Sequence, residues 1–391
     1  MTAHRTLSLD EARRVWRSRQ RLDGGSRDLA AVVSAVGWVP VPVVATPLLA
    51  LRARGAITLR AELDAALFTQ RTLELTPGPR GMLWLVPTEE APWARAFAVA
   101  DHATREGRLS AACGLTSGDL RGARDALRAA LETPVEPGRL RERLPSSALR
   151  PLGEAGRRAG CDTLAGMVLR GMWAGGEVTR EPVEPRVDRA PCRYLLDPRP
   201  RVVPAAAEAV DVVAPRWIAA HGPTTLKSFS LAFGIATGRA AQAVRGAKLE
   251  RVHVEGLHGE FLAPAGFEVP APGAEPTVDF LPFRDPLVDA NPTLAGLCPS
   301  SLVKDLRLRD LGYRPLVLVD GAVVASWSYA PDDTVRVAWP LDHDVSLEPR
   351  VREAAASLAR FIASEAPSPT LHTTALPRRI PALYGALGAD L

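Results

Sequence analysis

The chain has 391 residues, of which 47% are hydrophobic and 24% are charged, and this composition excludes an intrinsically disordered protein. Its length predicts roughly two to four domains rather than one core. The formal net charge is +4, but residues 1–60 contain ten arginines and only four acidic residues, a surplus of six positive charges. This asymmetry favours an anionic partner for the N-terminal part of the protein.

The four cysteines lie far apart in the sequence and form no CxxC pair, which argues against a disulfide framework and against a zinc site. The sequence contains no Gly-rich phosphate loop, no HExxH motif and no apolar run of membrane-spanning length. We therefore expect no metal, no cofactor, no membrane association and no export. The predicted setting is the cytoplasm.

The N-terminal part begins with a capping box at Ser8-Leu9-Asp10-Glu11, which predicts a helix from about 9 to 22. The segment Pro40-Val41-Pro42 must be extended, because proline removes an amide donor and clashes with the preceding helical turn. The flanking pattern predicts helices and one strand, and helices followed by strands are typical of a winged helix. The helices are expected over 28–36, 47–54 and 62–69, and the strand over 81–86.

The same order of elements is expected twice more. A helix over 162–173 precedes a Gly-Gly stop and a strand in the second unit. In the third unit a helix ends at His221-Gly222, further helices cover 226–233 and 237–247, and 249–262 alternates as a hairpin with His258-Gly259 near its turn. We predict an α+β, mostly helical fold with three tandem winged-helix units and a small C-terminal β-barrel-like domain. The predicted boundaries are 1–100, 101–190 and 191–264 for the three units, 265–282 for a linker and 283–391 for the barrel-like domain.

The third unit has the residue types that contact phosphates and base edges. Its candidate recognition helix has basic and amide side chains on one face. A scaffold role without DNA contact is the alternative. The candidate DNA-binding residues of this unit are Lys227, Arg239, Gln242, Arg245, Lys248 and His258.

Six stretches of the sequence, taken in their order and spacing, resemble the winged-helix DNA-binding proteins that include the AlkZ-like and YcaQ-like DNA glycosylases. The resemblance implies three winged helices that cradle double-stranded, damaged DNA, followed by a β-barrel. The stretches are LSLDEARRVWRSRQRL, VGWVPVPVVATPLLALRARG, PRGMLWLVPTEEAPW, WIAAHGPTTLKSFSLAFGI, LPFRDPLVD and PLVLVDGAVVASW.

The resemblance also indicates where catalysis would occur. The catalytic signature of the family is Gln-x-Gln or Gln-x-Asp, and counting back from Leu51 and Arg54 places these two residues on Pro40 and Pro42. Proline offers neither a donor nor a side-chain acceptor for a catalytic water. The family's Arg-Gly-Thr-x-His stretch is Arg80-Gly81-Met82-Leu83-Trp84 in this chain, so its polar Thr and His are replaced as well.

The resulting hypothesis is a DNA-binding protein on a glycosylase scaffold that lacks the standard catalytic pair. One alternative is an active alkylpurine or crosslink glycosylase with a different site, for which Gln20, Asp23 and Arg80 are the candidates. Another is a transcription regulator or a scaffold that does not bind DNA. If DNA is bound, we expect Arg19, Arg21, Arg52 and Arg54 to contribute to the contact.

Overall fold

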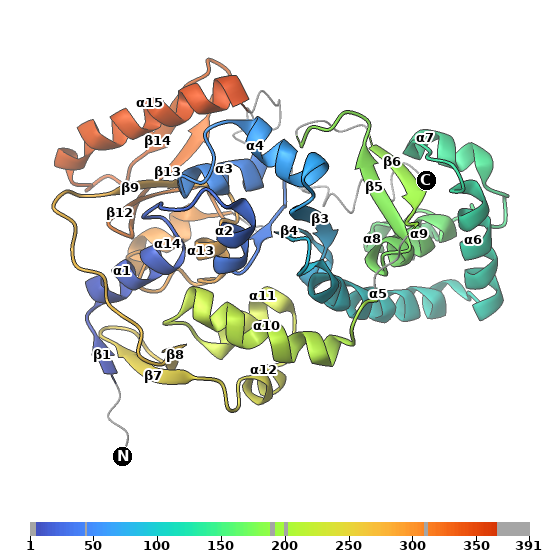
Figure 1. Ribbon diagram of the computed structural model, residues 1–391, viewed down its shortest axis with the longest axis horizontal. Helices are drawn as coiled ribbons and strands as arrows, with labels where there is room; N and C mark the ends of the chain where they lie inside the picture. Colours follow the sequence, from blue (N-terminus) through green and yellow to red (C-terminus); the bar gives the residue numbers. More distant parts are fainter. Residues whose placement is uncertain (1–4, 44, 188–191, 199–201, 309–311, 366–391) are drawn as a thin grey trace.

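The computed structural model describes residues 5–43, 45–187, 192–198, 202–308 and 312–365, in which helices alternate with small sheets (Figure 1). None of the helices in these ranges combines the length and the apolar character that a membrane span requires. The elements fall into successive groups along the chain.

The first group contains the predicted capping box, because Ser8 Oγ accepts from the Glu11 amide and the Glu11 carboxylate accepts from the Ser8 amide. The strands after α2 form a sheet in the order β2-β4-β3. The extended conformation predicted at Pro40 is therefore confirmed. The elements are β1 (Arg5–Leu7), α1 (Leu9–Arg19), α2 (Leu29–Ala35), β2 (Val39–Pro40), α3 (Ala45–Ala53), α4 (Arg60–Asp64), a π-helical turn (Ala65–Thr69), β3 (Leu73–Pro77), a 3-10 turn (Pro79–Gly81) and β4 (Leu83–Pro87).

The second group starts with a long helix that leads away from the first group (Figure 1). Its last strand pairs with the preceding strand and also forms an isolated bridge between Tyr194 and Val135. The elements are α5 (Ala91–Cys113), α6 (Ser117–Ala130), α7 (Pro137–Leu140), a 3-10 turn (Arg141–Arg143), α8 (Gly153–Ala159), α9 (Leu164–Ala174), β5 (Val178–Pro182) and β6 (Cys192–Leu196).

The third group has the predicted helix over 226–233 and the hairpin, with a bridge between Thr224 and Leu262. The helix expected over 237–247 ends at Ala243, so Arg245 and Lys248 follow it instead of lying on it. Strand β1 pairs in parallel with β7, so the N-terminal residues 5–7 extend the sheet of the third group. This pairing brings together segments that are about 250 residues apart, and the sequence gives no local signal for it. The elements are α10 (Ala206–His221), α11 (Leu226–Phe233), α12 (Thr237–Ala243), β7 (Leu249–Val254) and β8 (Phe261–Pro264).

The C-terminal group is a four-stranded antiparallel sheet in the order β14-β13-β12-β9. The expected barrel is wrong for the described residues, since this sheet is open and its edge strands β9 and β14 do not pair with each other. Helix α15 contacts both β9 and β14 and buries one side of the sheet. The elements are β9 (Val278–Leu281), α13 (Pro286–Asp289), α14 (Ser300–Leu306), β10 (Arg307–Leu308), β11 (Gly312–Tyr313), β12 (Leu316–Val319), β13 (Ala322–Tyr329), β14 (Val335–Ala338), a 3-10 turn (Val345–Leu347) and α15 (Glu348–Glu365).

The core packing joins segments that are distant in sequence. Val15 and Trp16 of α1 pack with Val252 of β7 and Leu316 of β12 in one buried cluster. Helix α1 therefore connects the third group with the C-terminal sheet, and the end of α1 lies where several groups meet (Figure 1).

Candidate functional site

Of the two prolines that the resemblance places at the catalytic positions, Pro40 lies in strand β2 and Pro42 lies in the bend after it. Pro40 pairs with Trp84 of β4, and the Val41 amide donates to the Leu83 carbonyl at 2.8 Å. Both Pro40 and Pro42 are buried. These positions thus present neither a polar side chain nor an exposed surface.

A strained turn leads into this strand. Trp38 has a φ of 74°, which is unusual for a bulky residue with a Cβ. Its indole Nε1 donates to Glu90 Oε2 at 2.6 Å, and Ser34 Oγ donates to the other oxygen of the same carboxylate at 2.5 Å. Glu90, the residue before α5, therefore fixes the turn between α2 and β2.

Gln20 lies in a buried polar network at the end of α1. Its Nε2 donates to the Ala220 carbonyl at 3.0 Å, and its Oε1 accepts from Arg54 Nη2 at 3.3 Å. Arg54 makes a bidentate ion pair with Asp285, at 2.7 and 3.0 Å, and both side chains have no exposed surface. The side-chain oxygen and nitrogen of Gln20 are thus both engaged within the protein.

His221 completes this network from the C-terminal end of α10. Gln20 Nε2 lies 2.8 Å from His221 Nδ1, and since an amide nitrogen can only donate, Nδ1 accepts and the ring proton is on Nε2. A Cβ added at Gly37 would lie 2.9 Å from His221 Nε2. The imidazole therefore packs directly against the backbone that leads into β2. Burial, together with the charge of Arg54, lowers the pKa of His221 to about 3.

This shift predicts a pH-dependent stability. The folded-state pKa of His221 is depressed below the value of about 6.5 in the unfolded chain, so the unfolded state binds more protons between about pH 6.5 and 3, and stability falls as pH falls through this window. We expect the free energy of unfolding to be about 2 kcal/mol lower at pH 5 than at pH 7 because of this group. Urea denaturation at both pH values measures the change. The His221→Asn variant, which keeps an acceptor, should show a correspondingly smaller difference, and an equal difference in both proteins would contradict the assignment.

The other two catalytic candidates lie apart from this network. Asp23 is exposed, and its carboxylate makes no hydrogen bond or ion pair with any residue in the described ranges. Arg80 is exposed in the turn before β4, with a φ of 61°, and its Nη1 donates to the Leu231 carbonyl of α11 at 3.4 Å. Gln20, Asp23 and Arg80 therefore do not form one constellation.

The arginines of the N-terminal segment have different environments. Arg21 is exposed, and Arg19 is half-buried with Nη1 donating to the Ala219 carbonyl at 3.1 Å. Arg52 donates to Ser357 Oγ at 3.2 Å and lies over the Phe361 ring of α15. Of this set, Arg21 is exposed, Arg19 and Arg52 are partly exposed, and Arg54 is buried.

Most of the third-unit candidates are exposed. Lys227, Gln242, Arg245, Lys248 and His258 are solvent-accessible, and none of these side chains has a hydrogen-bond or ion-pair partner in the parts of the chain that the structure describes. Arg239 differs, because it donates to the Ala207 carbonyl and forms an ion pair with Asp211 of α10, both at 2.6 Å. Arg239 thus anchors α12 to α10.

Sequence reasoning missed Asp285, His221 and Asp279 as members of the buried network. Asp279, which is 5% exposed, accepts from Arg17 at 2.8 and 3.2 Å. The available signal was Asp285-Pro286, a typical start of a helix, in which Asp285 accepts from the Leu287 amide at 3.0 Å. No local feature of the sequence shows that the Asp285 carboxylate, which caps this helix, also pairs with Arg54.

The solved structure of Streptomyces sahachiroi DNA glycosylase AlkZ is similar to this fold with a TM-score of 0.73 and 18% sequence identity, over 93% of this chain and 99% of that chain. No curated protein matches the sequence of this chain. Residues 33–361 match the model of the family described as DNA glycosylase AlkZ-like, and the chain belongs to that family.

Proposed function

We propose that this protein binds duplex DNA through winged-helix units of a glycosylase scaffold and lacks the family's standard base-excision chemistry. The observation that carries the proposal is a set of exposed basic side chains on the third unit that have no partner among the described residues, combined with the buried prolines at the positions that the resemblance makes catalytic. The protein is proposed to act as a monomer at the nucleoid.

The strand pairings support the assignment of winged helices. In each unit the short extended segment after an early helix pairs with the last strand of the hairpin: Pro40 with Trp84, Val135 with Tyr194 and Thr224 with Leu262. This arrangement, a helix-turn-helix followed by three short strands, is typical of a winged helix. In helix-turn-helix proteins the second helix of the motif enters the major groove. In the third unit that helix is α12, next to Arg245 and Lys248.

The environment of Gln20 does not favour the alternative of an active glycosylase that uses Gln20 as a catalytic residue. A residue that holds an attacking water needs a donor or acceptor open to the reaction site, whereas Gln20 is fully buried and bonded to Arg54, Ala220 and His221. Binding without hydrolysis is therefore the favoured function.

Duplex binding should depend steeply on salt, because neutralised phosphates release counterions. We expect little sequence preference and a linear fall of the logarithm of the association constant with the logarithm of the salt concentration. Fluorescence anisotropy titrations at several salt concentrations test this expectation. An affinity that does not respond to salt, or no binding at low salt, would contradict the proposal.

The third unit should carry part of this electrostatic contact. The double variant Lys227→Ala/Arg245→Ala should bind duplex DNA more weakly, and each lost phosphate contact should make the salt slope shallower by about one unit. The matched control is Arg336→Ala, since Arg336 lies on the C-terminal sheet and pairs with Asp332. If the folded double variant kept the native affinity and slope, the contact would have to lie on another unit.

A further inference from the structure

The three units differ in what surrounds the helix directly before the hairpin. This helix is the second helix of the helix-turn-helix motif, the one that enters the major groove. It is α4 with the π-helical turn after it in the first unit, α9 in the second and α12 in the third. To enter a groove, the helix needs an outer face open to solvent and side chains free to contact DNA. These two requirements separate the three helices.

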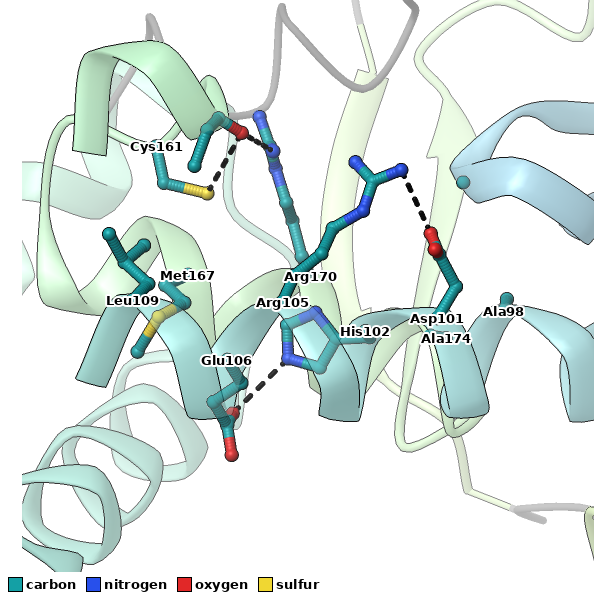
Figure 2. A pocket seen from close by; sticks show the side chains of 12 residues that line it. Ala98, Asp101, His102, Arg105, Glu106, Leu109, Cys161, Met167, Arg170 and Ala174 are labelled. Atoms are coloured by element: carbon teal, nitrogen blue, oxygen red, sulfur yellow. Dashed lines mark hydrogen bonds and ion pairs between the residues drawn. The ribbon is translucent and has the colours of Figure 1, made fainter. Parts of the chain in front are cut away.

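Helix α9 of the second unit has no open face. Every residue of α9 except Gly171 is buried, and the helix contacts α5, α6 and β5. At Gly171 a Cβ would lie 2.5 Å from His102 Nε2, so α5 packs directly against the backbone of α9. Only a small hollow lies between the two helices, with Met167 of α9 and Leu109 of α5 among the residues that line it (Figure 2).

The side chains of α9 are also unsuited to contact with DNA. Its sequence, LAGMVLRGMWA, contains one charged residue, Arg170. This arginine is 7% exposed, and its guanidinium donates to the carbonyls of Ala159 and Gly160 at the end of α8. Helix α9 is therefore a core helix, and DNA could reach it only if α5 moved away.

The equivalent helix of the first unit is held by two other parts of the protein. The Arg60 amide at the start of α4 donates to Glu365 Oε2 at the end of α15, at 2.7 Å. Asp64 Oδ1 accepts from the Val187 amide, in the hairpin of the second unit, at 2.7 Å. The Arg60 guanidinium, the one basic group of this helix, pairs with the Asp64 carboxylate. The helix thus lies against α15 and the second unit, and its arginine is engaged within the protein.

Helix α12 of the third unit has the opposite environment. Its inner face is anchored at Ala240, which is buried. Gln242 is exposed on the helix, Arg245 and Lys248 are exposed directly after it, and Lys227 is exposed at the start of α11. Among the residues that the structure describes, none forms a hydrogen bond or an ion pair with these four side chains. The third unit therefore offers a supported helix with a free polar face.

Resting on the proposed function, we infer that only the third unit inserts a helix into DNA, so that the protein contacts a single major-groove segment of one duplex. The first and second units use their equivalent helices to hold the protein together. The family resemblance implies three winged helices that cradle DNA, and the packing of α4 and α9 limits the groove contact to one of them.

The salt dependence of binding should then come from the third unit. The double variant Lys227→Ala/Arg245→Ala removes two exposed cations next to α12. It should lower the slope of the logarithm of the association constant against the logarithm of the salt concentration by about two units, because each neutralised phosphate contributes about 0.9. Anisotropy titrations with an unmodified duplex measure the slope.

Two matched double variants remove the same charge from the other units. Arg27→Ala/Arg71→Ala changes side chains of the first unit that are 64% and 74% exposed. Arg121→Ala/Arg193→Ala changes exposed arginines on α6 and β6 of the second unit. Both variants should keep the native affinity and slope. Melting curves verify that all three double variants are folded.

A modified duplex tests the single groove segment directly. In a DNA hairpin with two helical turns of duplex, cytosines are replaced by glucosylated 5-hydroxymethylcytosine, whose sugar projects from C5 into the major groove. Modification of one turn should leave binding on the other turn with an unchanged salt slope. Modification of both turns should abolish binding.

A loss of slope in either matched variant equal to that of Lys227→Ala/Arg245→Ala would overturn the inference and leave the proposed function intact. Loss of binding after modification of one turn would also overturn it, because the contact would then span several groove segments. Native binding after modification of both turns would place the contact outside the major groove and overturn it too. Failure of the native protein to bind the unmodified duplex would overturn the proposed function, and this inference with it.

Discussion

Replacement of Arg54 by methionine should destabilise the protein by about 3–5 kcal/mol, the usual cost of removing one partner of a buried ion pair. The reason is that the carboxylate of Asp285 would remain in a site without solvent contact and would lose its bidentate partner. The change in the free energy of unfolding is measured by urea denaturation. The same network holds the ends of α1, α3 and α10 together through Gln20 and His221, so the loss should be a global one.

The control for this change is Arg336→Met, which breaks an exposed ion pair with Asp332 at 3.0 Å and should cost less than about 1 kcal/mol. The double variant Arg54→Met/Asp285→Asn should be less destabilised than the two single changes added together. Equal costs for Arg54→Met and Arg336→Met would show that the buried pair does not stabilise the fold.

The second prediction with a large expected effect concerns the rate of base excision. We expect the protein to release N7-methylguanine from duplex DNA no faster than the base is lost spontaneously. The leaving group is cationic and needs little help, but the attacking water must be placed and polarised beneath an oxocarbenium-like sugar. Loss of aligned acid–base groups costs about 10²–10⁴-fold in rate, and Pro40 and Pro42 provide none of them. The Gln20→Ala variant should behave like the native protein, because Gln20 is buried within the network.

The local features of the fold were predictable from the sequence. The capping box at Ser8 starts α1, and the hairpin predicted over 249–262 is formed by β7 and β8. These features depend on a few adjacent residues and on strong local preferences.

The features that were missed depend on contacts between distant segments. Helix α5 has consecutive buried residues from Ala94 to Ala98 because it lies between units, so its sequence shows no single apolar face. The partner of Arg54 is Asp285, which lies 231 residues further along the chain.

The central claim is tested most directly by single-turnover base release from a duplex carrying one N7-methylguanine, with binding followed by anisotropy in the same samples. The account predicts saturable, salt-sensitive binding together with a release rate equal to that of the DNA alone. Release well above that rate by the native protein would contradict the account, and it would show that residues other than those at positions 40 and 42 provide the catalytic groups.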